Sequence, residues 1–276
     1  MTLRTNENIM KMVTTPETKA PASRAALAPL FVHHRHLRVV VDAILQGYCG
    51  TAVVSPGSKV QVAQLTVGVF TFFGGDPTQP LARTLVERLS GERIIVSAEG
   101  GWRETILCAH GERIGTEKRL SFSSAKLDLE HLRILTSRLP DRFHIERITI
   151  DHARRIRADV DPDLLLPEVF ASPLDFVQQG VGFCALTAGQ MVCAATSAFI
   201  CDGAIEIQIN TNKAYRSLGL ATAVGATLLV HCLEHGIDPH WDTGDPASER
   251  VAEKLGYVPD SAYEWLLLHR DPGNGA

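Results

Sequence analysis

The chain has 276 residues, of which 45% are hydrophobic and 21% are charged. This balance is ordinary for a globular protein with a full-sized core, and the length predicts two compact units. The formal net charge of −4 gives no reason to expect nucleic acid or an anionic membrane surface as a partner. Apolar runs such as residues 228–230 fall far short of a bilayer span, so no membrane partner is expected.

Neither a leader sequence nor a metal site is expected. The first residues lack the charged and then apolar layout of a secretory signal, which favours a cytoplasmic protein. The six cysteines lie far apart without a Cys-x-x-Cys pair, and most fall in apolar runs, where a free thiol behaves as a small hydrophobe. His33, His34 and His36 form a cluster, but Arg35 and Arg38 would repel a cation, which favours a solvated basic helix start.

The first half of the chain, residues 26–124, predicts an α/β domain. It follows residues 1–25, which are rich in Thr, Pro, Ala, Lys and Glu without periodicity and indicate a mobile tail. Pro56 and Gly57 mark the turn between its first two strands. The expected elements are helices over residues 37–45, 81–89 and 102–109 and strands over residues 51–55, 62–73, 93–97 and 119–122.

A second domain is expected over residues 141–270, after a connection over residues 125–140. Asp151 is a suitable N-cap for a helix that runs through Ile156. The apolar and irregular stretch over residues 164–179 predicts part of the wall of the acceptor pocket. The remaining expected elements are a connecting helix over residues 129–139, strands over residues 144–150, 182–187 and 191–199, and a fraying end over residues 271–276.

The most informative pattern lies between Ile205 and Tyr257. Residues 205–210 alternate strictly between apolar and polar side chains, which predicts a half-buried strand. The turn that follows has the pattern Arg-x-x-Gly-x-Ala, from Arg216 to Ala221, and opens into an apolar helix that stops at Gly236. Because such a turn aims several backbone N–H groups and a helix N-terminus at one point, it suits a pyrophosphate.

The residues after that helix make the pattern more specific. A short strand is expected over residues 240–243, and Asp245 with Pro246 forms an N-cap and N1 pair for a further helix. The segment closes with Gly256 and Tyr257. A turn, strand, helix and glycine–aromatic exit at this spacing resemble the GCN5-related N-acetyltransferase (GNAT) superfamily.

Further residues are similar to the GNAT branch that includes the zwittermicin A resistance acetyltransferase. They are Tyr215-Arg216, Cys232-Leu233, Pro239, Trp241-Asp242 and residues 252–257. The resemblance implies an α/β (α+β) fold with a mixed, mostly antiparallel sheet flanked by helices. It also implies acetyl-CoA as a co-substrate, without a metal.

The helix and strand order at the end of the first half echoes the second half. Residues 74–80, where a phosphate loop would stand, lack the Arg-x-x-Gly-x-Ala pattern, and Pro77 and Pro80 have no N–H to donate. We therefore expect a second, degenerate GNAT-like half that binds no CoA. Unrelated strand orders in the two halves would contradict this hypothesis.

By resemblance, the cofactor is held by the turn and by the strand before it. Backbone amides of residues 218–221 would bind the pyrophosphate, and the end of the strand would splay from its neighbour to receive the pantetheine arm. The alternatives are a tight strand–helix turn with a surface arginine, and an ordinary sheet ladder. For Ser248, the alternative to a cofactor contact is simple solvation of the helix start. For Asp245, the alternative is a role as the helix N-cap alone. The predicted cofactor-binding residues are Ile209, Asn210, Thr211, Arg216, Ser217, Leu218, Gly219, Leu220, Ala221, Thr222, Asp245 and Ser248.

Glu206 is the predicted catalytic residue. It lies on the polar face of the strand, where GNAT enzymes with a glutamate base often hold it, and a structural or solvent-facing strand glutamate is the alternative. Many GNAT enzymes use a tyrosine as the general acid, but Ala252 occupies the matching position in this chain. Tyr257, Tyr263, water or no group at all then serves as the acid. Trp241 is expected in the core.

The resemblance implies an acetyl-CoA-dependent N-acetyltransferase that acts on the amine of a small molecule, such as an antibiotic or a metabolite. A non-catalytic acyl-CoA-binding protein and an acyltransferase for longer acyl chains stay open. The sequence does not specify the acceptor or the oligomeric state, for which a homodimer is one expectation.

Overall fold

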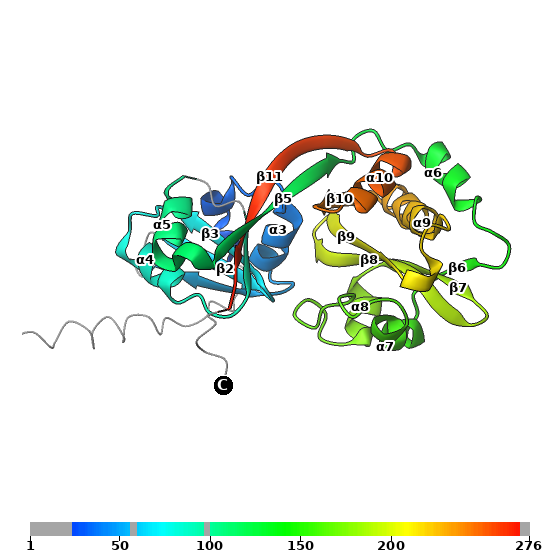
Figure 1. Cartoon of the computed structure of the whole chain (residues 1–276), viewed down its shortest axis with the longest axis horizontal. Coiled ribbons are helices and arrows are strands. Elements are labelled where there is room, and N and C mark those ends of the chain that lie inside the picture. Colours follow the sequence, from blue (N-terminus) through cyan, green and yellow to red (C-terminus); the bar gives the residue numbers. More distant parts are fainter. Residues whose placement is uncertain (1–23, 56–59, 97–99, 271–276) are drawn as a thin grey trace, which may run out of the picture. The chain divides into compact units, whose positions relative to one another are not determined.

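A computed structural model describes residues 24–55, 60–96 and 100–270. Some predicted segments lie outside these residues: the tail over residues 271–276, the turn at Pro56 and Gly57, and residue 97 of one predicted strand. Of the tail over residues 1–25, only residues 24 and 25 are described. Packing groups the chain into two compact units, whose elements are labelled in Figure 1. The first unit runs up to Arg35, over Ile44–Glu117 and from Glu264, and the second contains His36–Ala43 and Lys118–Tyr263. The predicted domain boundaries at residues 124 and 141 stay a prediction.

The first unit is built on a sheet with the order β1-β2-β3-β4-β11-β5. Strands β1 to β3 are antiparallel, β4 is parallel to β3, and β11 is antiparallel to β4. Two strands, β5 and β11, and helix α3 also contribute to the second unit. The elements are α3 (Arg38–Gln46), β1 (Thr51–Val54), β2 (Val62–Val67), β3 (Phe70–Gly75), α4 (Pro80–Glu87), β4 (Arg93–Val96), α5 (Gly101–His110), β5 (Ile114–Ser123), β11 (Val258–Leu268) and short 3-10 turns at Ala28–Phe31 and Gly111–Arg113.

The second unit has the strand order β6-β7-β8-β9-β10-β5-β11. Strands β6 to β9 are antiparallel, β10 is parallel to β9, and β5 is antiparallel to β10. The remaining elements are α6 (Leu129–Thr136), β6 (His144–Arg147), α7 (Ile150–Asp159), α8 (Pro173–Gln179), β7 (Gly182–Thr187), β8 (Gln190–Cys201), β9 (Ala204–Thr211), a 3-10 turn at Lys213–Tyr215, α9 (Leu220–Glu234), β10 (Asp238–Thr243) and α10 (Pro246–Leu255).

The two units share one strand pattern. Each has an antiparallel meander that ends in a parallel pair, β3 with β4 in the first unit and β9 with β10 in the second. The next strand is antiparallel and comes from the other half of the sequence, β11 in the first unit and β5 in the second. The strand orders are therefore related, as the hypothesis of a degenerate first half requires.

The core of the second unit that supports the site lies between the sheet and α6, α9 and α10 (Figure 1). Helix α9 is apolar on nearly all sides and contacts four strands, β7 to β10. Gly225 allows the close approach, since a Cβ there would lie 2.8 Å from Ile209 Cδ1. Trp241 is buried with its ring 5.4 Å from that of Tyr257, which confirms its predicted place in the core.

Several local predictions were wrong. The strand expected over residues 62–73 is two strands, because the chain turns at Gly68, whose φ is 53°. The strand expected over residues 144–150 ends at Arg147, and the helix expected over residues 129–139 ends at Thr136. His34 is buried, with Nε2 2.8 Å from the Phe73 carbonyl oxygen, and is not part of a solvated helix start.

The N-cap of α7 is Thr149, not Asp151. The Thr149 hydroxyl accepts a bond from the His152 N–H, and the Thr149 N–H donates to Nδ1 of His152, which completes a capping box. Asp151 lies in the first turn of the helix and pairs with Arg154 at 2.9 Å. In the part of the chain that the structure describes, no helix has the length and apolar character needed to cross a bilayer.

Candidate active site

Strands β9 and β10 pair at their beginnings and then separate. The paired residues are Ala204 with Asp238, Ile205 with Pro239, and Glu206 with His240. Beyond this point β10 pairs with β5, while β9 continues along β8 as far as Thr211. The separation leaves the edge of β9 that carries Ile209, Asn210 and Thr211 without a β10 partner, as the resemblance implied.

The turn before α9 contains two residues in the left-handed region of backbone conformation. Ser217 has a φ of 63°, and Gly219, the N-cap of α9, has a φ of 80°. A Cβ added to Gly219 would meet no atom within 4 Å, so the space in front of the turn is open. The first helical bond runs from the Ala223 N–H to the Gly219 carbonyl, which leaves the N–H groups of residues 220–222 directed out of the helix start.

The predicted loop residues contribute mainly through this backbone. Leu220 is buried, while Ser217, Leu218 and Gly219 are exposed and Ala221 and Thr222 are half-buried. The exposed Arg216 donates from Nε to the Thr211 carbonyl at 3.2 Å, and this bond ties the turn to the end of β9. The end of β9 and the turn before α9 are therefore held together.

Asp245 caps α10, as the sequence predicted. Its Oδ1 accepts a bond from the Ala247 N–H at 3.1 Å, and its own N–H donates to Thr243 Oγ1 at 2.9 Å. Ser248 is half-buried in the first turn of α10. Contacts of Asp245 and Ser248 with a cofactor stay a prediction.

Glu206 lies at the point where the strands separate. It is only 6% exposed, which excludes a solvent-facing strand glutamate, and its Oε2 atom has no hydrogen-bond partner in the described structure. Burial raises the pKa of this carboxyl well above its usual value; Asp242 and Asp238 raise it further, and Arg119 opposes them. A buried carboxyl with an unused oxygen is placed to accept a proton.

A charged cluster beside Glu206 was missed in the sequence. Arg119 on β5 donates from Nε and Nη2 to the two oxygens of Asp242 on β10, both at 2.9 Å. The Tyr263 hydroxyl donates to Asp242 Oδ2 at 2.5 Å, and the Tyr263 ring stacks on His36 with centroids 4.1 Å apart. Arg119 lies more than a hundred positions from both Asp242 and Tyr263 in the chain, and no sequence pattern joins the three residues.

The two tyrosines considered as general acids both have hydroxyl groups that are engaged elsewhere. Ala252 is fully buried in the core. The Tyr257 hydroxyl donates to the Pro239 carbonyl at 2.9 Å, and the Tyr263 hydroxyl donates to Asp242. Burial raises the pKa of both phenols, and the Asp242 carboxylate adds to this effect for Tyr263. Neither tyrosine is arranged to protonate a leaving group.

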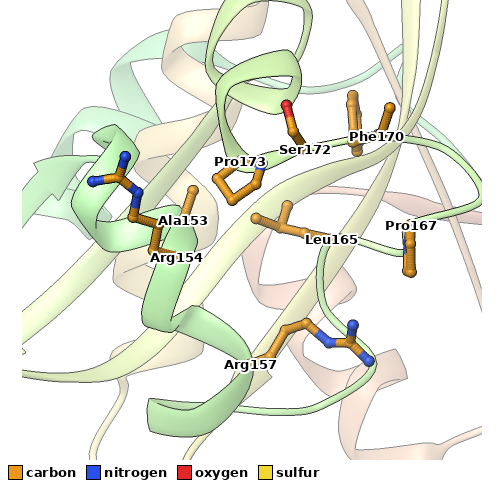
Figure 2. A pocket seen from close by; sticks show the side chains of 9 residues that line it. Ala153, Arg154, Arg157, Leu165, Pro167, Phe170, Ser172 and Pro173 are labelled. Carbon is orange, nitrogen blue, oxygen red and sulfur yellow. The ribbon is translucent and has the colours of Figure 1, made fainter.

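The stretch predicted as a pocket wall lines a cavity of about 180 Å³ beside α7 (Figure 2). Leu165, which has a φ of 52°, and Phe170 line it, while Arg154 and Arg157 approach from the helix. Arg157 donates from Nε to the Pro162 carbonyl at 2.7 Å, which holds the loop on the helix. The stretch therefore lines a cavity, and its predicted role as part of the acceptor pocket stays a prediction.

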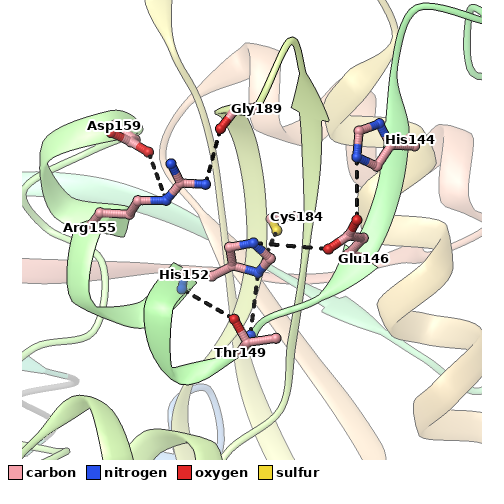
Figure 3. A network of polar contacts seen from close by, with 8 residues as sticks. All are labelled: His144, Glu146, Thr149, His152, Arg155, Asp159, Cys184 and Gly189. Carbon is pink, nitrogen blue, oxygen red and sulfur yellow. Dashed lines mark hydrogen bonds and ion pairs between the residues drawn. The ribbon is translucent and has the colours of Figure 1, made fainter.

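A second polar network near α7 looks like a nucleophile with its base but is structural (Figure 3). Cys184 Sγ lies 3.7 Å from His152 Nδ1, and Glu146 lies 4.0 Å from His152 Nε2. Cys184 is fully buried, and burial raises the pKa of its thiol to about 12. A protonated, inaccessible thiol is not a nucleophile, so this network serves to cap α7. Among the described residues, no group of three or more His, Cys, Asp or Glu side chains is placed to hold a metal.

Comparisons with known proteins agree with this geometry. A model of the GNAT acetyltransferase family matches residues 28–266. An uncharacterized N-acetyltransferase, YdfB, of Bacillus subtilis (strain 168) is 35% identical over 98 residues, which are 35% of this chain and 38% of that protein. The match to this relative therefore spans well under half of its length.

Solved structures extend the likeness to nearly the whole chain. A GCN5-related N-acetyltransferase-like protein from Streptococcus suis 89/1591 is 28% identical with a TM-score of 0.76, over 90% of this chain and 99% of that one. A tandem GNAT protein from the clavulanic acid biosynthesis pathway has a TM-score of 0.53 at 11% identity, over 81% of this chain and 83% of that one. At that identity the likeness concerns the fold alone.

Proposed function

The chain belongs to the GNAT acetyltransferase family, and we propose that its second unit binds acetyl-CoA and transfers the acetyl group to the amine of a small molecule. One observation carries the proposal. Strands β9 and β10 separate after Glu206 and His240, and the open edge of β9 leads directly to the left-handed turn at the start of α9. Along this one stretch of chain, the buried carboxyl of Glu206 comes first, the open edge of β9 follows, and the proposed anion site at the start of α9 comes last.

The residues present fit the co-substrate. The N–H groups at the start of α9 and the open space before Gly219 suit a pyrophosphate. The edge of β9 over Ile209, Asn210 and Thr211 suits the amides of a pantetheine arm. When bound, acetyl-CoA supplies an activated thioester, in which the acetyl carbon exchanges its bond to sulfur for a bond to the amine nitrogen and the sulfur leaves as a thiolate.

Glu206 is the proposed base. An amine must lose a proton to react, and a carboxyl at the separation point is placed to take it directly or through one water. Since Tyr257 and Tyr263 both commit their hydroxyls, we expect the thiolate to be protonated by water. A thiolate is a tolerable leaving group, so the replacement of the usual tyrosine by Ala252 does not remove the activity.

The acceptor is proposed on resemblance. The zwittermicin A resistance branch suggests an amino-bearing antibiotic or metabolite, and a cytoplasmic location would suit such a substrate. One solved structure of similar fold is described as a tandem GNAT protein, and a tandem arrangement with a degenerate first half is proposed for this chain. The alternative that the donor is a longer acyl-CoA is tested by competition between acetyl-CoA and longer acyl-CoA thioesters.

Binding is tested by calorimetric titration of acetyl-CoA into the wild type, Gly219→Trp and Gly203→Trp. Both glycines have a positive φ, 80° and 77°, and open space around them, so the two substitutions carry a matched strain. Gly203 lies in the turn before β9, at the other end of that strand from Gly219. We expect binding to the wild type and to Gly203→Trp but not to Gly219→Trp. Equal binding to all three folded proteins would contradict the site.

Catalysis is tested separately. A panel of small amines is supplied with acetyl-CoA, and release of free thiol is recorded for the wild type and Glu206→Gln. Thiol release by the wild type and its loss in a variant that still binds acetyl-CoA would support the base. Binding without amine-dependent thiol release would favour the non-catalytic acyl-CoA-binding alternative.

A further inference from the structure

The Arg119–Asp242–Tyr263 cluster joins three strands on one face of the second unit. Arg119 lies on β5, Asp242 on β10 and Tyr263 on β11. The guanidinium holds both carboxylate oxygens of Asp242 at 2.9 Å, and the side chains of Arg119 and Asp242 are only 14% and 8% exposed. A bidentate pair of this kind, buried and supported by a phenol, is fixed in position.

This cluster and Glu206 face the same side of the sheet. His240 pairs with Glu206, and Asp242 follows two residues later on β10, so the His240 and Asp242 side chains leave the strand on the same face. The electrostatic coupling agrees with this placement: Asp242 raises the pKa of Glu206 and Arg119 lowers it. The cluster therefore acts on the proton that Glu206 holds.

We propose that Arg119 is a positioning residue, which neutralises Asp242 and so keeps the Glu206 carboxyl able to act as the base. The inference rests on the proposed function. It also assigns part of the catalytic site to β5, which lies outside the predicted acetyltransferase domain of residues 141–270. With Arg119 in place, the Arg119–Asp242 pair is neutral, and ionisation of Glu206 creates one net negative charge. Without Arg119, ionised Glu206 would face a second, uncompensated carboxylate.

Other charged and titratable groups also lie around Glu206, among them His240, which pairs with it across the two strands. Asp238 on β10 bonds to His240 at 3.2 Å and to Ser124 at 2.6 Å, and these partners lower its pKa to about 2. Asp238 is therefore an anion throughout the working pH range. Burial keeps the phenols of Tyr257, after α10, and of Tyr263, on β11, protonated. On α3, Arg38 and Asp42 act on Asp238 and His240 and form an ion pair at 3.3 Å.

The arrangement predicts opposite effects for the two partners. Arg119→Gln leaves Asp242 as an unbalanced anion, so the acid limb of the pH profile of kcat/KM moves to higher pH. Asp242→Asn removes a negative charge that raises the pKa of Glu206, so the limb moves to lower pH. The double variant Arg119→Gln/Asp242→Asn removes both charges, so its limb returns close to the wild type. On the acid limb, a shift of one pH unit to higher pH lowers kcat/KM at a given pH by about tenfold, and the same shift to lower pH raises it by about tenfold.

The test measures these profiles in the full chain, together with carbon-13 NMR titration of the glutamate carboxyls, in which Glu206→Gln assigns the Glu206 signal. Arg133→Gln, which breaks the exposed Arg133–Glu234 pair, is the matched control and should leave the limb unmoved. Arg119→Lys keeps the positive charge, so its acid limb should lie much closer to that of the wild type than the limb of Arg119→Gln does. Acetyl-CoA affinity measured by calorimetry should change less than twofold in every variant.

Several results would overturn the inference. A uniform loss of rate at all pH values in Arg119→Gln would mean a structural role, as would limbs that move in the same direction in both single variants. If Arg119→Gln does not fold, the double variant and Asp242→Asn still decide the sign. If no amine yields thiol release, the proposed function fails, but the carboxyl titration continues to test whether Arg119 and Asp242 move Glu206 in opposite directions.

Discussion

Glu206 on β9 and His240 on β10 form the last residue pair between these strands. Beyond it, β10 finds a new partner, since Trp241 pairs with Phe122 on β5. In the strand order, β5 lies on the other edge of β10 from β9, so β5 holds β10 in the sheet where β10 is no longer paired with β9. The opening that defines the site thus depends on a strand from the first half of the sequence.

The buried Glu206 carboxyl predicts a pH-dependent effect of Glu206→Gln on stability. Its folded-state pKa is raised by burial above the ordinary value of 4.5, so the stability tied to this group is fully present below that value and is lost as the pH rises through the folded-state pKa. Glutamine carries no charge at any pH. Relative to the wild type, Glu206→Gln should gain stability as the pH rises from 4 to 8, on the order of 1 kcal/mol.

Thermal unfolding followed by circular dichroism at several pH values checks this. Glu253→Gln is the control, because Glu253 is exposed on α10. A Glu206→Gln difference that stays constant across the pH range would show that the pKa of Glu206 is the same in the folded and unfolded proteins and that its burial has no such effect.

The capping box at α7 predicts a contrast between two neighbouring residues. Thr149→Ala removes the acceptor of the His152 N–H and should cost about 1 kcal/mol of stability. Asp151→Ala removes only a pair with Arg154, whose side chains are 63% and 80% exposed in the pair, and should cost less than about 0.5 kcal/mol. Urea unfolding of the two variants gives the comparison. Equal losses would mean that Asp151, as the sequence suggested, holds the helix start.

Two substitutions at Asp245 distinguish its role as the helix N-cap from a contact with the cofactor. Asp245→Ala removes the acceptor of the Ala247 N–H and should cost about 1 kcal/mol, whereas Asp245→Asn keeps an oxygen there and should cost a few tenths. Acetyl-CoA affinity is measured beside unfolding. Weaker binding in Asp245→Asn, without a change in stability, would assign Asp245 to the cofactor as well as to the helix.

The turn, helix and strand over residues 205–257 were predictable because their signals are local. Alternation marks β9, the glycine at a positive φ marks the start of α9, and the Asp245–Pro246 pair marks the start of α10. The chain turn at Gly68 was missed because the residues on both sides of it are apolar and suit one long strand. The N-cap of α7 was assigned to Asp151 because Thr149 was placed inside the strand expected over residues 144–150.

The charged cluster could not be predicted from the sequence. Arg119, Asp242 and Tyr263 meet only because β5 and β11 are adjacent to each other and β5 to β10 in the sheet order. That order depends on an exchange of strands between the two halves, which no local pattern encodes. Glu206 was found by its place in a motif, but the residues that set its charge state are found only in the fold.

The left-handed turn before α9 gives the last prediction, in which Ser217 and Gly219 respond oppositely. Ser217 has a φ of 63°, a strained value for a residue with a side chain, so Ser217→Gly should hold or raise stability by up to about 1 kcal/mol. Gly219→Ala introduces the same strain at a φ of 80° and should cost about 1 kcal/mol, although its methyl group meets no neighbour. Calorimetry of both variants with acetyl-CoA then separates stability from binding. Because the added methyl group points into the open space before the helix, Gly219→Ala should weaken binding about tenfold, or about 1.4 kcal/mol, while Ser217→Gly should keep it within a few-fold. Unchanged affinity in Gly219→Ala would place the pyrophosphate elsewhere.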